Sequence, residues 1–449
     1  MRLLKKRRNF WKHGSVLCTA VFHYLSGGGI MQNTDQMVQN TDRNEREKVI
    51  LVGIETGAEE PEEQSLDELA DLAGTAGAAV AGRLIQARES AHPGTYIGKG
   101  KILELKELIW ESEASGIICD DELTSAQLGN LEEELNCKVL DRTLLILDIF
   151  AGRAVTGEGK LQVELAQLRY RASRLSGLGR SLSRLGGGIG TRGPGEKKLE
   201  VDRRRIRERI SRLKRELKDV ENHRELIRNQ RSRSGLKTAA LVGYTSAGKS
   251  SIENALTHAG IAEDAMLFST LDTTTRSLML DNTQEILLTD TVGFIRKLPH
   301  HLVEAFKSTL EEARYADILI HVVDASNPDM DTQMHVVYET LRELGAEGKP
   351  VVTLFNKQDL LEEPVVQRDF RAEYSIAASA RTGQGLEELK AALLEILRRD
   401  QIYIERMYSF DEAWKLQLIR SRGQLVSEEY LPEGVCVKAY VPGEIYGKL

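Results

Sequence analysis

The sequence has few cysteines and no long apolar segment. Its four cysteines, Cys18, Cys119, Cys137 and Cys436, are scattered over 449 residues without metal-ligand spacing. We therefore expect reduced thiols, no disulfide framework and no cysteine metal site. No run approaches the roughly eighteen apolar residues of a membrane span, so we expect a cytoplasmic protein that is at most peripheral to a membrane. The net charge of −7 gives no sign of nucleic-acid binding by the chain as a whole.

Residues 243–250 are the most informative segment that the sequence does contain. They follow an apolar run and open a predicted helix. The glycines let the backbone turn successive N–H groups toward an anion, while Lys249 reaches the terminal phosphates and Ser250 offers a hydroxyl to magnesium. The segment therefore predicts a phosphate-binding loop. It consists of Gly243, Tyr244, Thr245, Ser246, Ala247, Gly248, Lys249 and Ser250.

Three further segments follow in the order that a nucleotide-binding domain requires. The first places Asp290 where it can hold magnesium through water, with the Gly293 N–H near the γ-phosphate. The second carries Asp359, whose carboxylate accepts the N1–H and the 2-amino group of guanine but would lie unpaired against the bare ring nitrogen of adenine. Each segment alone could be an ordinary βα turn, but together they predict a guanine nucleotide site. The segments are Asp290-Thr291-Val292-Gly293, Asn356-Lys357-Gln358-Asp359 and Ser379-Ala380-Arg381, the last of which resembles a base-contacting loop of GTPases.

The N-terminal region divides into an extension and a small domain. Residues 1–46 are predicted to be a disordered or spurious extension ahead of a start at Met31 or Met37. Its basic and then apolar sequence copies a signal peptide, but His23 and the lack of a small-residue cleavage site argue against export. Over residues 47–150, strands alternate with helices, which predicts an α/β domain. The predicted strands are Val49–Val52 and Gly116–Cys119, and the predicted helices are Leu66–Ile85 and Gly100–Glu113.

Residues 151–235 carry a one-sided charge. Heptad seams that begin at Leu161 and Ile206 predict an antiparallel helical hairpin with a glycine- and arginine-rich tip at 176–195. From Leu165 through Lys237 there are 22 basic and 8 acidic residues, a local net charge of +14. This excess favours contact with the phosphates of structured RNA over the alternative of a solvated helix face. Aromatic residues are nearly absent from the window, so base stacking is not expected.

The remaining regions complete the predicted fold class. A P-loop GTPase domain is expected over residues 236–398, and a small α+β domain over 399–449. The whole chain is therefore predicted to be α/β, with the GTPase domain preceded by the small α/β domain and its helical hairpin. A length of 449 residues is ample for this number of domains.

With these segments in hand, the chain resembles the HflX family of ribosome-associated GTPases from about residue 48 to its end. The most specific stretches are residues 182–196, LSRLGGGIGTRGPGE, and residues 268–272, FSTLD. The resemblance implies binding to the large ribosomal subunit, a hairpin tip directed at its peptidyl-transferase region, and splitting or rescue of stalled ribosomes under stress. At the tip we expect contacts to ribosomal RNA from Arg180, Arg184 and Arg192.

The resemblance also selects a switch threonine. The residues alone do not distinguish Thr270 from Thr274 and Thr275, but the family pattern implies that Thr270 binds magnesium and releases after hydrolysis. We therefore expect Lys249, Thr270 and Gly293 to act in catalysis, and Ser250, Thr270 and Asp290 to hold Mg²⁺, Asp290 through water. The switch segment is Phe268, Ser269, Thr270, Leu271 and Asp272.

Two positions affect the expected hydrolysis. Ser246 stands where the family usually has an asparagine that helps to hold a monovalent cation, so stimulation by potassium is left open. Phe294 stands where Ras-like enzymes place a glutamine that orients the attacking water, and a phenyl ring cannot form that hydrogen bond. We therefore expect slow intrinsic turnover of GTP and stimulation by a bound partner.

The expected partners follow from these interpretations. They are the large ribosomal subunit and its RNA, without DNA, and the protein is expected to act as a monomer. Two alternatives remain open at this point. One is an RNA-binding ribosome-assembly factor that uses GTP as a switch, and the other is a signalling GTPase held at a membrane by the basic N-terminus.

Overall fold

The computed structural model describes most of the chain, and within it two compact units. One unit consists of Met1–Gly152 with Ala166–Ile210, and the other of Arg153–Leu165 with Ser211–Leu449. No helix within the described ranges is both long and apolar enough to cross a bilayer. The described residues are 46–57, 62–184, 194–234, 236–257, 267–268, 274–281, 284–297, 299, 302, 307–363, 367–399 and 401–449.

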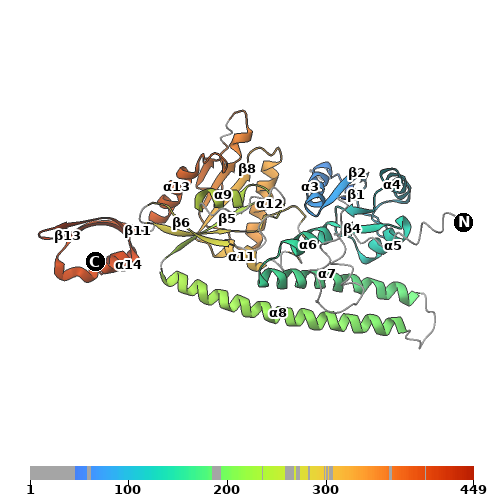
Figure 1. The fold of residues 1–449 in the computed structure, drawn as a ribbon, viewed down its shortest axis with the longest axis horizontal. Helices are drawn as coiled ribbons and strands as arrows, with labels where there is room; N and C mark the ends of the chain where they lie inside the picture. Colours follow the sequence, from blue (N-terminus) through green and yellow to red (C-terminus); the bar gives the residue numbers. More distant parts are fainter. Residues whose placement is uncertain are drawn as a thin grey trace, which may run out of the picture. The chain divides into compact units, whose positions relative to one another are not determined.

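The first sheet has four parallel strands in the order β2-β1-β3-β4 (Figure 1). Burial on both faces is typical of a parallel sheet covered by helices. Leu105 of α4 and Leu131 of α5 pack in one core with Ile50 and Ile117. The strands are β1 (Glu47–Glu55), β2 (Ala78–Ala87), β3 (Gly116–Cys119) and β4 (Lys138–Asp141), and the helices are α3 (Glu62–Thr75), α4 (Lys99–Ser112), α5 (Ser125–Leu135) and α6 (Arg142–Arg153).

One helix predicted in this domain is wrong over its second half. The predicted helix Leu66–Ile85 ends as α3 at Thr75, and β2 begins at Ala78. Gly77 has a φ of +86°, a left-handed conformation that commonly ends helices. The alanine-rich residues after it suit either structure, and pairing with β1 along its whole length decides for the strand.

The hairpin consists of α7 (Gly157–Arg184) and α8 (Pro194–Ser234). The two helices are antiparallel, because Arg203 donates to the carbonyl of Leu175 at 2.5 Å near one end and Arg224 pairs with Glu158 at 2.7 Å near the other. The helix α7 continues to Arg184, well beyond residue 176 where the sequence pattern placed the start of the tip. The rest of that tip, 185–193, lies outside the described residues.

The GTPase domain has a six-stranded sheet in the order β10-β9-β8-β5-β7-β6, parallel except for β6. Leu256 of α9 and Leu389 of α13 share a core with Leu241, Ile320 and Leu354, so these helices cover one face. Helices α11 and α12 contact β5 and β8. The strands are β5 (Lys237–Gly243), β6 (Thr274–Met279), β7 (Glu285–Asp290), β8 (Ile318–Asp324), β9 (Val351–Asn356) and β10 (Tyr374–Ala377). The helices are α9 (Lys249–Thr257), α11 (Lys307–Tyr315), α12 (Met330–Glu343), the 3-10 turn η1 (Gln358–Leu360) and α13 (Leu386–Arg398).

The C-terminal segment forms an antiparallel sheet in the order β11-β13-β12 with a helix on one face (Figure 1). Alternate residues of β13, including Val437 and Ala439, are buried with Leu416 and Ile419 of α14, as expected for a sheet covered on one side. The segment is therefore the small α+β fold that was predicted. Its elements are β11 (Gln401–Tyr408), η2 (Phe410–Glu412), α14 (Ala413–Arg422), β12 (Gln424–Leu431), β13 (Gly434–Pro442) and α15 (Gly443–Tyr446).

Candidate nucleotide-binding site

The loop between β5 and α9 has the backbone that a phosphate-binding loop needs. Gly243 and Gly248 have φ angles of +153° and +96°. A Cβ at Gly243 would lie 2.2 Å from the carbonyl oxygen of Val322, and one at Gly248 would lie 2.3 Å from Nδ2 of Asn356. Only glycine fits both positions. The loop ends at the N-terminus of α9, where helix N–H groups favour an anion.

Lys249 lies at the first position of α9, with its ammonium group buried beneath the loop. Nζ donates to the carbonyl oxygens of Tyr244 at 2.8 Å and of Gly243 at 3.1 Å. Burial lowers the pKa of this ammonium group to about 8, and the nearby carboxylate of Asp290 acts in the opposite direction. A phosphate would supply the missing counter-charge, so the lysine is well placed to bind one.

Ser250 and Asp290 lie together beside the loop. Oγ of Ser250 donates to Oδ2 of Asp290 at 2.8 Å, and the Asp290 side chain is buried. Hydroxyl and carboxylate oxygens are ligands that magnesium prefers, usually alongside substrate phosphates and water. Across the described ranges, no group of three His, Cys, Asp or Glu side chains is arranged to hold a metal ion. The oxygens of Ser250 and Asp290 are of the kind that would fit a magnesium ion bound together with the nucleotide phosphates.

The switch threonine falls outside the described residues, together with Ser269, Leu271 and Asp272; Phe268 is described and is buried. The two other candidate threonines are described. Oγ1 of Thr274 donates to Oε2 of Glu253 at 3.1 Å, and Oγ1 of Thr275 lies 3.2 Å from Oγ1 of Thr289. Both hydroxyls therefore have partners within the protein, and Thr270 stays a prediction.

The segment after β7 is joined to the phosphate loop through its backbone. The N–H of Thr245 donates to the Phe294 carbonyl at 2.9 Å, and the N–H of Phe294 donates to the Gly243 carbonyl at 3.1 Å. A Cβ at Gly293 would lie 2.8 Å from Cγ2 of Thr245 and 3.0 Å from Nζ of Lys249, so a side chain does not fit there. The Phe294 ring is buried and offers no hydrogen bond to a water. Thr291 donates to the carbonyl of Leu241 at 2.6 Å.

The base-contacting segments meet the phosphate loop through Asn356. Its Nδ2 donates to the Ala247 carbonyl at 2.8 Å, and its Oδ1 accepts from the N–H of Ala380 at 3.0 Å. Oδ1 of Asp359 accepts from Oγ of Ser379 at 2.7 Å, and Nη1 of Arg381 lies 3.8 Å from Oδ2. These contacts bring the second and third predicted segments together. Gln358, within η1, is buried.

Asp324, beside the base-contacting segments, was not predicted from the sequence. Asp324 ends β8, and its carboxylate accepts from Nζ of Lys357 at 2.6 Å. This bond ties β8 to Lys357, which lies in the base-contacting segment 356–359 and has a φ of +65°. The sequence did contain a signal for Asp324, because this acidic residue ends an apolar strand, as Asp290 also does.

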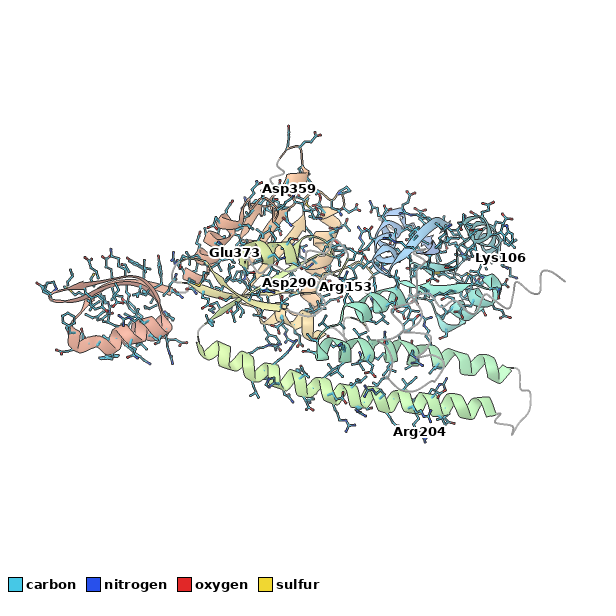
Figure 2. All side chains as sticks on the ribbon, in the orientation of Figure 1. Lys106, Arg153, Arg204, Asp290, Asp359 and Glu373 are labelled. Atoms are coloured by element: carbon cyan, nitrogen blue, oxygen red, sulfur yellow. The ribbon has the colours of Figure 1, made fainter. Side chains whose placement is uncertain are left out.

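The arrangement suits the transfer of a phosphoryl group to water. Lys249 and the N–H groups at the start of α9 can absorb charge on the terminal phosphate without reorganising. Asp290 and Asp359, both labelled in Figure 2, mark the candidate metal-binding and base-binding parts of the site. When bound, magnesium would neutralise further charge on the phosphates. The side chains around that position would bind and orient the nucleotide.

The predicted RNA-contacting arginines are only partly described. Arg180 and Arg184 belong to α7, but their side chains, and Arg192 altogether, lie outside the described residues. On α8, the side chain of Arg204 is 73% exposed, and that of Arg212 is 65% exposed. Figure 2 shows Arg204 on the side of α8 that faces away from α7. The described part of the hairpin therefore presents basic groups to its surroundings along α8.

Comparison with protein families finds three matches in the chain. A model described as "GTP-binding GTPase N-terminal" matches residues 63–151, and one described as "GTP-binding GTPase Middle Region" matches residues 153–231. A model described as "50S ribosome-binding GTPase" matches residues 238–357. Together these cover most of the small α/β domain, most of the hairpin and most of the nucleotide site.

Curated relatives agree with the family models. The GTPase HflX of Lacrimispora saccharolytica is 62% identical over 403 residues, covering 90% of this chain and 95% of that protein. The GTPase HflX of Escherichia coli is 43% identical over 354 residues, covering 78% of this chain and 83% of that protein. Among solved structures, a GTP-binding protein from Sulfolobus solfataricus in complex with GDP is 26% identical, with a TM-score of 0.41, covering 78% of this chain and 98% of that one.

Proposed function

This chain belongs to the HflX family of GTPases and hydrolyses GTP, and on that premise we propose that it binds the large ribosomal subunit and splits or rescues stalled ribosomes under stress. The observation that carries the proposal is the basic hairpin, with its local net charge of +14 from Leu165 through Lys237, which leads directly into the GTPase domain. A family model described as "50S ribosome-binding GTPase" matches residues 238–357. A charge of this size favours a polyanion such as ribosomal RNA.

The hairpin would contact RNA through its phosphates. Arg180, Arg184 and Arg192 would reach ribosomal RNA from the tip, and exposed arginines of α8 such as Arg204 would add attraction along the shaft. Contacts of this kind release counterions, so binding weakens steeply as salt rises. The scarcity of aromatic side chains favours structured RNA over stacked single strands.

The ribosome would also set the rate of hydrolysis. Water attacks the γ-phosphorus in line, while Lys249, the loop N–H groups and the Gly293 N–H stabilise charge. Magnesium would be held by Ser250, Thr270 and, through water, Asp290. Phe294 is buried and cannot orient the water, so intrinsic turnover is slow and a bound ribosome supplies the missing order. Ser246 leaves the role of potassium open.

Sedimentation with purified 50S subunits tests the proposal. The protein is mixed with subunits under GTP, GDP or a non-hydrolysable GTP analogue, at low and moderate salt. We expect the analogue to give the tightest binding, and moderate salt to weaken it steeply. Equal binding with all three nucleotides contradicts a nucleotide-dependent ribosome factor.

Matched variants sharpen this experiment. Replacing Arg180, Arg184 and Arg192 by glutamine should weaken 50S binding about tenfold or more and lower the salt dependence, because about three phosphate contacts are lost. The control replaces Arg342, Arg371 and Arg420, which lie outside the hairpin, and should bind normally. Preference for immature subunits would identify an assembly factor instead, and sedimentation with membranes would identify a membrane-bound GTPase.

A further inference from the structure

A fully buried carboxylate lies close to the metal-binding part of the nucleotide site. Glu253 belongs to α9, and none of its side chain is exposed. It follows Lys249 by four residues and Ser250 by three, so all three lie on one side of the helix. No sequence motif pointed to Glu253, and it has no role in the proposed attack of water on the γ-phosphorus.

The partners of this carboxylate both belong to β6. Oγ1 of Thr274 donates to Oε2 at 3.1 Å and to Oε1 at 3.3 Å. Nε of Arg276 lies 3.5 Å from Oε1. Thr274 is the first residue of β6, the strand that follows the switch segment 268–272 in the chain. Glu253 therefore ties the phosphate-binding helix to the start of that strand.

The other side of β6 leads to the magnesium-binding pair. Thr274 stands opposite Asp290 in the antiparallel pairing of β6 with β7, and Asp290 accepts the hydroxyl of Ser250 at 2.8 Å. A closed path of contacts therefore runs from Glu253 of α9 to Thr274 of β6, then to Asp290 of β7, and back to α9 at Ser250. A shift of β6 would move Asp290 relative to Ser250.

Keeping a carboxylate in this position is costly. Burial raises the pKa of Glu253 to about 7, the charge of Asp290 acts in the same direction, and the bond from Thr274 and the charge of Arg276 act against them. An apolar side chain of similar size would avoid this cost of desolvation. Packing alone therefore does not explain a glutamate here.

We propose that Glu253 is a positioning residue for GTP hydrolysis, which holds the start of β6 through Thr274 and Arg276 and so fixes Asp290 against Ser250. Hydrolysis requires metal, phosphate and water to be aligned to a fraction of an ångström. Binding of GDP depends on the phosphate loop and on Asn356 and Asp359. Loss of Glu253 should therefore slow turnover far more than it weakens GDP binding.

Intrinsic GTPase kinetics of the full chain, without ribosomes, test this role. Glu253→Leu should lower kcat about tenfold, because misalignment by a fraction of an ångström has effects of this order. The Kd for GDP and the Tm should change little. Thr274→Val should have a similar effect, and the double variant should be no slower than Glu253→Leu, because both changes remove one contact. Glu253→Gln keeps an oxygen that accepts from Thr274 and should retain most of the activity.

The control uses a second carboxylate–hydroxyl pair on the same strand. Ser277 of β6 donates to Glu285 of β7, at the exposed end away from Asp290. Glu285→Leu should leave kcat unchanged. The proposal is overturned if kcat of Glu253→Leu is unchanged. It is also overturned if kcat, GDP affinity and Tm of this variant all fall together. If Glu253→Leu does not fold, kcat of Thr274→Val decides instead. Ribosomes are absent, so the result is independent of the ribosome proposal.

Discussion

The parallel sheet of the N-terminal domain and the mostly parallel sheet of the GTPase domain use the edge at the carboxyl ends of their strands in opposite ways. In each, the chain turns at the carboxyl ends of the strands, where α/β proteins usually bind ligands. In the GTPase domain that edge carries glycine turns that expose backbone N–H groups. In the N-terminal domain it carries charged side chains that bind one another. The contrast teaches that side chains of a domain can fill the edge at which other α/β domains bind ligands.

Arg142 lies at the centre of the edge that the carboxyl ends of the strands form in the N-terminal domain, the N-terminal edge. Its side chain is 1% exposed, and Nη1 donates to Oδ1 of Asp120 at 2.5 Å while Nη2 donates to Glu68. Ser65 donates to Oδ2 of Asp120 at 2.7 Å. Charges buried in this way are stable only because each has a partner of opposite sign. This part of the edge is therefore occupied by the domain itself.

Asp141 attaches the hairpin to the same edge. It ends β4 and accepts the Tyr170 hydroxyl at 3.0 Å and a guanidinium N–H of Arg174, both on α7. The N–H groups of Leu123 and Leu144 donate to it at 3.1 and 2.9 Å. The N-terminal edge thus uses an acidic side chain to hold the helix α7, whereas the GTPase edge offers N–H groups and the ammonium group of Lys249.

The largest expected effect tests whether one edge alone hydrolyses nucleotide. Lys249→Ala should lower kcat for GTP about a thousandfold, because the ammonium that stabilises the transferring phosphate is lost. The control is Lys101→Ala on α4 of the N-terminal domain, which should hydrolyse GTP normally. The test measures phosphate release from GTP and from ATP in both variants. Activity that survives in Lys249→Ala and falls in Lys101→Ala would place a second site at the N-terminal edge.

The next effect concerns stability at the N-terminal edge. Arg142→Met should destabilise β1 and β3 by about 3 kcal/mol, because Asp120 and Glu68 lose a buried partner. Hydrogen exchange of those strands measures the change, and kcat per folded molecule should be unchanged. Arg83→Met removes an exposed pair with Asp67, whose side chains are 38% and 67% exposed, and should cost less than about 1 kcal/mol. Equal losses of stability in Arg142→Met and Arg83→Met would show that the stability of the N-terminal edge does not depend on its buried charges.

A third effect tests recognition of the base at the GTPase edge. Asp359→Asn should raise the Kd for GTP about a hundredfold, because an amide nitrogen would face two donors of guanine. Xanthosine triphosphate, whose C2 carbonyl can accept from that amide, should bind the variant better than GTP. Asp331→Asn on α12 is the matched control. Unchanged preference for GTP in Asp359→Asn would remove Asp359 from the base site.

The smallest effect is a pH dependence inside the GTPase sheet. Burial lowers the pKa of His321, in β8, from 6.5 to about 4. Between these values the unfolded chain binds a proton that the folded chain does not, so stability falls as pH falls through this window. From pH 7 to pH 5 the loss should be about 2 kcal/mol. In His321→Leu that loss should disappear from the hydrogen exchange of β8 and β9, whereas His335→Leu, at an exposed position, should behave as the unchanged protein.

Much of the candidate nucleotide site could be predicted from the sequence because its motifs are local. The phosphate loop needs glycine at fixed places in one short segment, and Asn356 to Asp359 act from a single turn. Asp324 and Glu253 escaped notice because each acts through a partner distant in sequence, Lys357 and Thr274. The strand β2 was mistaken for helix because its alanines suit either structure and only β1 decides between them.

The sequence by itself determined the nucleotide loops, the two long helices with their basic charge, and the order of the domains. These depend on residue spacing and charge, which are written along the chain. Only the tertiary structure decided which side chains fill the N-terminal edge, where the partners of Glu253 lie, and that Phe294 is buried. Burial and pairing arise when distant segments meet, and they set the desolvation cost and the geometry on which charge and catalysis depend.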